Sequence, residues 1–351
     1  MTPAEIWWEQ VGNALRLLSN VTNHLRDCRS TILHLPTAFP WRQFFYDAIE
    51  RRRTRFSESR RLMTLEWDGM CDPGIQVLDE LCTMEVRAEY YPGMTRGAYL
   101  GSRDDIVLCD YYVWVTGIHS KTQLLQWNEF IDQYERAAQK LRKKAVFILE
   151  YDGPDMPPTS MEQLSFVLED YDCRVFCLET ATMLANSAQR AYQAELALSI
   201  GGADPELCFA LLDQGDRFLR DPIAVTRKVI ADTRASDGRR FSPMDEQQII
   251  TAIWKAQLVL FFPILEQFRM DFVLKYRDQI ARSLPIWESN GDQITDPLDL
   301  EIGPLCYIIG SSSGAFSTVD SEAIRLCRKV RNTLAHNKIL SLEEIRCLPG
   351  S

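Results

Sequence analysis

An arginine and a histidine near the carboxyl end of the chain are the residues best suited to chemistry. Arg331 and His336 lie within residues 321–340, where apolar residues recur at helical spacing. A histidine can transfer a proton near neutral pH, and an arginine can neutralise developing negative charge on a phosphate. Attack of a ribose 2′-hydroxyl on the adjacent phosphate needs both groups. The pair would therefore suit acid–base chemistry at a phosphate.

Residues 321–340 predict an amphipathic helix with a polar face around the histidine. Leu326, Val330 and Leu334 recur at i, i+4 and i+8 and, with Cys327, would form the buried face. At 100° per residue, the other side gathers four polar side chains: Arg325, Lys329, Asn332 and His336. A histidine among cationic and amide groups suits an anionic ligand.

Both ends of this helix can be predicted. Asp320 is the expected N-cap, and Ser341 with Glu344 forms a capping box that starts a new short helix. His336 is therefore expected near a helix end, where it is accessible. Arg331 lies about 140° from His336 around a straight helix. The arginine must then reach round the helix or act at the site of a second copy, which favours a dimer.

Residues 331–336 read RNTLAH, and this segment resembles the R-N-x-x-x-H motif of the HEPN superfamily of all-helical domains. The resemblance implies metal-independent RNA cleavage at a cleft between two copies of the domain. In that reading Arg331 binds the scissile phosphate, His336 transfers protons and Asn332 orients both, with Arg325 and Lys329 as supporting cations. Domains of this superfamily that keep the motif without cleaving RNA provide the alternative of a structural or RNA-contacting remnant.

In the resembled family, a polar residue from an upstream helix often faces the motif histidine. Glu266 and Arg269 stand at i and i+3 in a helical segment, and either could take that position. The alternative is an ion pair within their own helix.

Composition predicts a globular protein with only local contacts to nucleic acid. A length of 351 residues favours two domains, and 46% hydrophobic with 25% charged residues argues against disorder. The net charge of -10 excludes a uniformly basic surface. The 10 cysteines are scattered without a C-x-x-C pair, which indicates reduced thiols in a cytoplasm and no zinc site. The amino end reads as an amphipathic helix, and the longest apolar run, 258–265, is far shorter than the roughly 18 residues of a membrane span.

The first part of the chain alternates strand and helix patterns, which predicts an α/β domain with a mostly parallel sheet covered on both faces. Helices are expected at 41–55 and within 121–144. Five strands are expected, at 31–36, 62–67, 112–116, 145–150 and 174–178.

This order of elements resembles the core of P-loop NTPases and AAA-like proteins, over roughly residues 25–235, with 159–231 standing where a helical lid would be. The phosphate loop should be rich in glycine and end in lysine and a hydroxyl. The corresponding segment, 35–42, reads LPTAFPWR and has no glycine. Glu150 and Asp152 end the fourth strand and could bind a metal, but such acids more often only mark a strand end. The prediction is a degenerate NTPase-like domain without cofactor or metal.

The polar segment 233–241 is the expected linker, so the predicted domains are 1–235 and 242–351. Ser242 with Pro243 should start a long apolar helix, kinked or broken at Pro263. With the later segments this gives an all-α, HEPN-like bundle of three or four helices.

Two basic stretches fall in the α/β part. The first is 51–55 with Arg60 and Arg61, and the second is 140–144. Each could contact phosphate or RNA, and each could simply be a solvated helix end.

The resemblance to the HEPN superfamily implies one function, including its role in defence or a toxin-like response, and the missing phosphate-loop residues support an alternative. The first is a HEPN-type endoribonuclease or RNA-binding effector of phage (antiviral) defence or a toxin-like response, cytoplasmic and homodimeric through 242–351. The alternative is a non-catalytic adaptor in a multi-subunit defence complex, assembling with a partner ATPase or nucleic-acid enzyme. A third option is a working NTPase with an unusual loop at 35–42.

Overall fold

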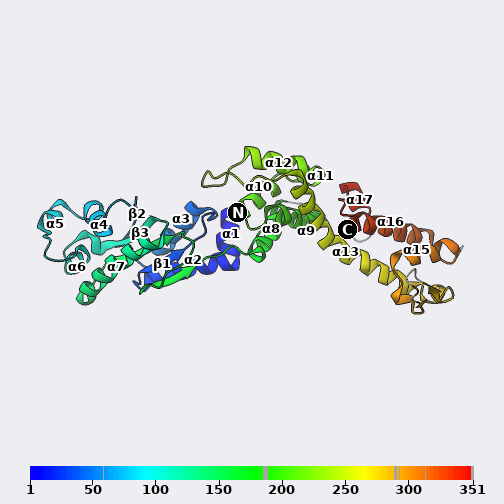
Figure 1. Cartoon of the computed structure of the whole chain (residues 1–351), viewed down its shortest axis with the longest axis horizontal. Helices are drawn as coiled ribbons and strands as arrows, with labels where there is room; N and C mark the ends of the chain where they lie inside the picture. Colours follow the sequence, from blue (N-terminus) through cyan, green and yellow to red (C-terminus); the bar gives the residue numbers. More distant parts are fainter. Residues whose placement is uncertain (58, 185–188, 288–290, 292, 313, 349–351) are drawn as a thin grey trace. The chain divides into compact units, whose positions relative to one another are not determined.

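The chain forms two compact units, residues 1–172 and 173–351, in the computed structural model of Figure 1. The structure describes all residues except 58, 185–188, 288–290, 292, 313 and 349–351. The boundary that we predicted at 235–242 lies inside the second unit, because residues 173–235 pack with the carboxyl-terminal helices.

The first unit is built on a five-stranded sheet in the order β2-β3-β4-β1-β5, in which every neighbouring pair is parallel. The α/β prediction with a parallel sheet is therefore confirmed. All six residues of the central strand β4 are buried, as expected for a sheet covered on both faces. The strands are β1 (Thr31–His34), β2 (Arg61–Glu66), β3 (Tyr111–Ile118), β4 (Val146–Tyr151) and β5 (Glu162–Ser165).

The predicted fifth strand at 174–178 is wrong. These residues belong to helix α8 (Asp170–Leu184), where Cys173, Phe176 and Cys177 are buried at helical spacing. The fifth strand is instead β5, which pairs with β1 at the edge of the sheet. Its sequence, EQLS, is mostly exposed and lacks the apolar alternation by which a strand is recognised.

Helices cover the two faces of this sheet. Trp114 of β3 contacts Phe45 of α3 on one face, while Phe147 of β4 contacts Phe130 of α7 on the other. The helical segments of this unit are α1 (Pro3–Gln10), α2 (Gly12–Arg26), α3 (Arg42–Arg53), α4 (Pro73–Leu81), α5 (Met84–Glu89), α6 (Arg96–Gly101), α7 (Lys121–Ala137) and the 3₁₀ helices η1 (Val107–Asp110) and η2 (Ala138–Lys140).

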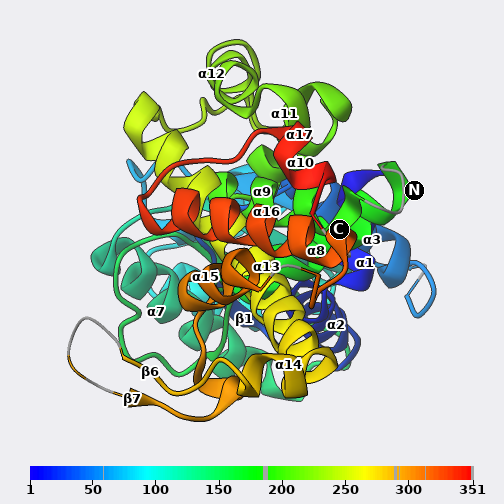
Figure 2. The ribbon, with the colours of Figure 1, turned by 90° about the vertical axis from the view of Figure 1, so that its right-hand side faces the viewer.

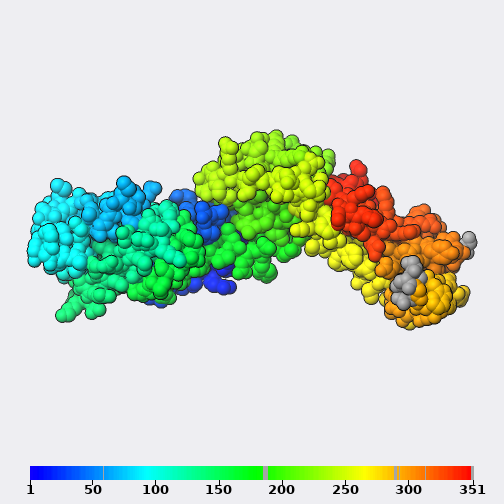
Figure 3. Space-filling view, viewed as in Figure 1, coloured from blue at the N-terminus to red at the C-terminus, as the bar shows by residue number. Residues whose placement is uncertain are grey.

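The second unit is helical and is organised around α13, which packs against α9 and α16. Figure 2 shows α16 crossing α13, with α15 beside it. The space-filling view shows the atoms of α16 closely packed along α13 (Figure 3). Besides α8, its elements are α9 (Arg190–Gly201), α10 (Pro205–Leu212), α11 (Asp216–Arg220), α12 (Pro222–Asp232), α13 (Glu246–Lys275), α14 (Arg277–Ala281), the hairpin β6 (Ile286–Trp287) and β7 (Gln293–Ile294), the 3₁₀ helix η4 (Pro297–Asp299), α15 (Ile302–Ser311), α16 (Thr318–Ala335) and α17 (Leu342–Arg346).

Helix α13 differs from its prediction at its start and at its proline. Its N-cap is Asp245 and not Ser242, because Asp245 and Gln248 satisfy each other's backbone N–H groups in a capping box. The helix continues through Pro263 without a break. By length and composition it is the one helix in the described part of the chain that could cross a membrane. Part of its surface is buried within the second unit, including Ile249, Gln257 and Phe261.

The predicted linker 233–241 is a folded loop of the second unit. Ala235 and Phe241 are buried, and the Ala235 N–H donates to the Arg239 carbonyl at 3.0 Å. The Arg239 guanidinium pairs with Asp204 at 2.9 Å. These contacts hold the segment within the fold of the second unit.

Candidate functional site

Helix α16 carries the RNTLAH segment and is fixed at its amino end to α13. The Ser317 side chain caps the helix by accepting from the Asp320 N–H, so the predicted N-cap Asp320 is wrong by one turn. The Asp320 carboxylate instead accepts from Lys275 at 2.6 Å and from the Tyr276 hydroxyl at 2.5 Å. The hydrogen bonds from Lys275, Tyr276 and Ser317 lower the pKa of Asp320 to about 2.

Three of the four residues predicted for the buried face of α16 are buried: Cys327, Val330 and Leu334. Leu326, the fourth, is only half-buried, and Ile324 is buried instead. The Trp254 indole of α13 donates to the Leu334 carbonyl at 2.7 Å and so holds the carboxyl end of the helix. Burial raises the pKa of the Cys327 thiol to about 11, which keeps it neutral. The polar residues of the opposite face are exposed: Arg325, Lys329, Asn332 and His336.

His336 is the C-cap of α16 and is exposed, as predicted. The next residue, Asn337, has a left-handed backbone with φ 56. The N–H groups of Asn337 and Lys338 donate to the carbonyls of Leu334 and Thr333, which is the Schellman pattern of helix ends. Within the described residues, the imidazole has no hydrogen-bond partner. These hydrogen bonds fix the backbone of the helix end, and the exposed ring is accessible to a ligand.

The Arg331 side chain contacts Glu301 and not His336. Its guanidinium donates to Glu301, the N-cap of α15, at 3.2 Å. The side chain lines a pocket of about 330 Å³, together with Phe262, Glu266, Arg269, Asp299, Leu300, Glu301 and Ile302. Among the described residues, no hydrogen bond or ion pair joins Arg331 to His336.

Glu266 and Arg269, the predicted partners of the histidine, lie beside Arg331 instead. Arg269 pairs with Glu266 at 2.8 Å, which is the intrahelical alternative, and also donates to the carbonyls of Leu298 and Leu300. Both arginines in this pocket therefore already have acceptors. Glu301 was not predicted as a partner of Arg331, because it lies 30 residues earlier in a segment without a motif.

The segment after His336, which contains α17, is joined to α16 by an ion pair. The Ser341 and Glu344 capping box is present, as predicted, and Lys329 pairs with Glu344 at 2.9 Å. The backbone hydrogen bond from Ser341, followed by Lys329, lowers the pKa of Glu344.

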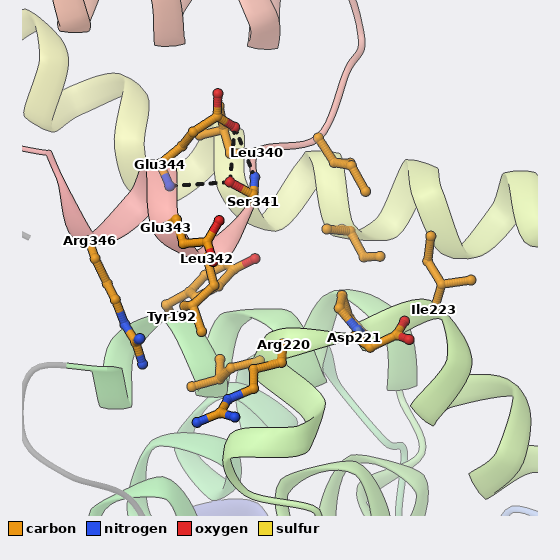
Figure 4. A pocket seen from close by; sticks show the side chains of 14 residues that line it. Tyr192, Arg220, Asp221, Ile223, Leu340, Ser341, Leu342, Glu343, Glu344 and Arg346 are labelled. Atoms are coloured by element: carbon orange, nitrogen blue, oxygen red, sulfur yellow. Dashed lines mark hydrogen bonds between the residues drawn. The ribbon is translucent and has the colours of Figure 1, made fainter.

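A pocket of about 630 Å³ lies beside this segment. Figure 4 shows the Ser341 and Glu344 hydrogen bonds above it and the guanidinium groups of Arg220 and Arg346 on its other side. His336 is not among its lining residues.

In the first unit, the segment at the phosphate-loop position is packed with aromatic residues. Phe39 is buried against Trp8 and Phe45, with ring centroids 5.0 and 5.2 Å away. The Trp8 indole donates to the Pro40 carbonyl at 3.1 Å. A bulky buried side chain therefore stands where a glycine-rich loop would bring its amides to a phosphate.

The acids that end β4 are also engaged. Glu150 is buried, pairs with Arg42, and accepts from Tyr46 at 2.5 Å and from Trp114 at 3.0 Å. Asp152 contacts His119 at 2.7 Å. No group of three or more metal-ligating side chains occurs within the part of the chain that the structure describes. These residues do not fit a nucleotide phosphate with its magnesium ion.

Comparison with models of known protein families gives no match, and no curated protein matches the sequence.

Proposed function

We propose that the protein is a HEPN-type, metal-independent endoribonuclease whose active centre is completed by two copies of α16. The observation that carries this proposal is the exposed His336, held at a helix end on the same face as Arg325, Lys329 and Asn332. This polar face can receive a phosphate backbone. Because Arg331 of the same chain points elsewhere, we infer that the arginine of one copy serves the histidine of the other.

The expected reaction follows from these two groups. His336 removes the proton of a ribose 2′-hydroxyl, and O2′ bonds to the adjacent phosphorus as the bond from phosphorus to O5′ breaks. The proton passes to O5′, which leaves a 2′,3′-cyclic phosphate and a 5′-hydroxyl. Arg331 stabilises the charge on the non-bridging oxygens. To do so it must release Glu301, and this half-exposed pair costs only about 0–1 kcal/mol to break.

The test is RNA cleavage by purified protein in the presence of a chelator. We expect His336→Ala and Arg331→Ala each to lose at least about 100-fold of the rate, the range typical of a general acid-base group. Arg277→Ala, an exposed arginine on α14, is the matched control and should cleave like the parent. Cleavage that survives in both variants, or that requires magnesium, would refute the proposal.

A second candidate is supported by the first unit. The aromatic packing of 35–42 and the buried network of Glu150 favour a non-catalytic adaptor that assembles with a partner ATPase or nucleic-acid enzyme. Absence of cleavage, together with co-purification of one such enzyme with the tagged chain, would favour this function. In either case we place the protein in the cytoplasm, in phage defence or a toxin-like response.

A further inference from the structure

A basic pocket of about 400 Å³ lies in the first unit, at the amino edge of the sheet. Arg60 immediately precedes β2, and Lys144 shortly precedes β4. The pocket thus brings Arg60 of the first basic stretch together with Arg142 and Lys144 of the second, about 80 residues further along the chain, because parallel strands start at the same edge of a sheet. The charged residues that line it are Arg60, Asp132, Glu135, Arg136, Arg142 and Lys144.

Arg60 is a buried cation without a carboxylate partner among the described residues. Only 7% of the residue is exposed, and its Nη1 has no hydrogen-bond acceptor. Its guanidinium carbon lies 5.2 Å from the ring centroid of Tyr112, which offsets part of the charge. A buried and uncompensated charge is costly, so an anion in the pocket would stabilise this arginine.

The other charges of the pocket leave an excess of cations. Four basic side chains, from Arg60, Arg136, Arg142 and Lys144, face two acids, Asp132 and Glu135. The contacts from Lys144 to Glu135 at 3.6 Å and from Arg136 to Asp132 at 4.0 Å are long. Both acids also accept hydrogen bonds from serine hydroxyls, of Ser160 and Ser30. Arg142 is exposed and has no ion pair within the described residues.

We propose that this pocket binds a phosphate group, with Arg60 and Arg142 as its main ligands. Guanidinium groups suit a phosphate because they donate two parallel N–H bonds to its oxygens. The phosphate can belong to a mononucleotide or to the backbone of an RNA strand. The site is separate from α16, so it stands whether or not the chain cleaves RNA.

The experiment measures binding to the full chain in phosphate-free buffer, by calorimetry with inorganic phosphate and with the four nucleoside monophosphates. Fluorescence anisotropy with a labelled single-stranded RNA is the third arm. We expect Arg60→Gln and Arg142→Gln to weaken binding at least tenfold. Arg16→Gln, an exposed arginine on α2 outside the pocket, should bind like the parent.

Each outcome separates the sources of the phosphate. Binding of monophosphates alone, lost in Arg60→Gln, identifies a small-molecule site. Tighter binding of RNA, weakened by salt and by the same substitution, identifies a backbone contact. Thermal unfolding without phosphate checks the fold, and Arg60→Gln should not lower the melting temperature, because it removes an unpaired buried charge. The proposal is overturned if the parent binds none of these ligands. It is also overturned if Arg60→Gln and Arg142→Gln bind as tightly as the parent does.

Discussion

Gln257 is a fully buried amide in the middle of the apolar helix α13. Its nitrogen donates to the Tyr192 hydroxyl and to the Leu340 carbonyl, both at 2.9 Å, and its oxygen accepts from the Leu340 N–H at 2.7 Å. Burial raises the pKa of Tyr192 to about 12, so the hydroxyl stays neutral. One side chain thus satisfies both backbone groups of Leu340, four residues after His336.

Replacement of the Gln257 amide should lower the stability of the fold. We expect Gln257→Leu to lower the free energy of unfolding by about 2–4 kcal/mol, because it leaves buried backbone groups without partners. Denaturation by urea measures the change. Gln247→Leu, on an exposed position of the same helix, should stay within about 0.5 kcal/mol of the parent. A loss below about 1 kcal/mol for Gln257→Leu would show that Leu340 has another source of hydrogen bonds.

Among the elements, the predictions that the structure confirms depend on spacing within a few residues, but local patterns also gave two wrong N-caps, Asp320 and Ser242, and a strand at 174–178 that is part of helix α8. The polar face of α16 and the capping box at Ser341 depend on spacing within a few residues, so the sequence sufficed. The partner of Arg331 could not be predicted, because Glu301 belongs to another helix. Strand β5 was missed because its pairing with β1, and not an apolar pattern of its own, makes it a strand.

The hydrogen bonds of Asp320 with Lys275 and Tyr276 join the start of α16 to the end of α13. They predict that the free energy of unfolding depends on pH. The folded pKa of Asp320, about 2, lies below its ordinary value of 3.8, so the folded state favours the carboxylate. Its contribution is present in full above about pH 5 and is lost as the pH falls through 3.8 to about 2. Asp320→Asn should therefore be less stable than the parent at pH 7, and the difference should vanish near pH 2.

Urea denaturation at pH 7, 4 and 2.5 measures this difference. Asp278→Asn, an exposed residue of α14 without an ion pair among the described residues, serves as the control and should show no such trend. A difference for Asp320→Asn that is the same at all three values would mean that its carboxylate is not stabilised by folding.

For the whole molecule, length predicted two parts, and the two compact units divide between residues 172 and 173, whereas the predicted boundary is 235–242. The polar segment 233–241 was read as a linker, yet Arg239 pairs with Asp204, and buried Ala235 and Phe241 fix the loop. A polar sequence does not reveal whether its partners are water or protein. Residues 173–235 therefore join the carboxyl-terminal helices, and the second unit is larger than the motif-bearing segment alone.

The proposed composite site makes a prediction that only an assembly of two chains can satisfy. If Arg331 of one copy serves His336 of the other, a mixture of Arg331→Ala and His336→Ala chains forms mixed dimers with one intact centre. With free exchange, half of the dimers are mixed and each has one of two sites, so the mixture should regain about one quarter of the parent activity. The readout is cleavage in chelator after the two inactive proteins are mixed and equilibrated. If both residues acted within one chain, no chain in the mixture would hold a complete site and no activity would return. A mixture that stays inactive, while size-exclusion chromatography shows mixed dimers, would therefore exclude the composite centre.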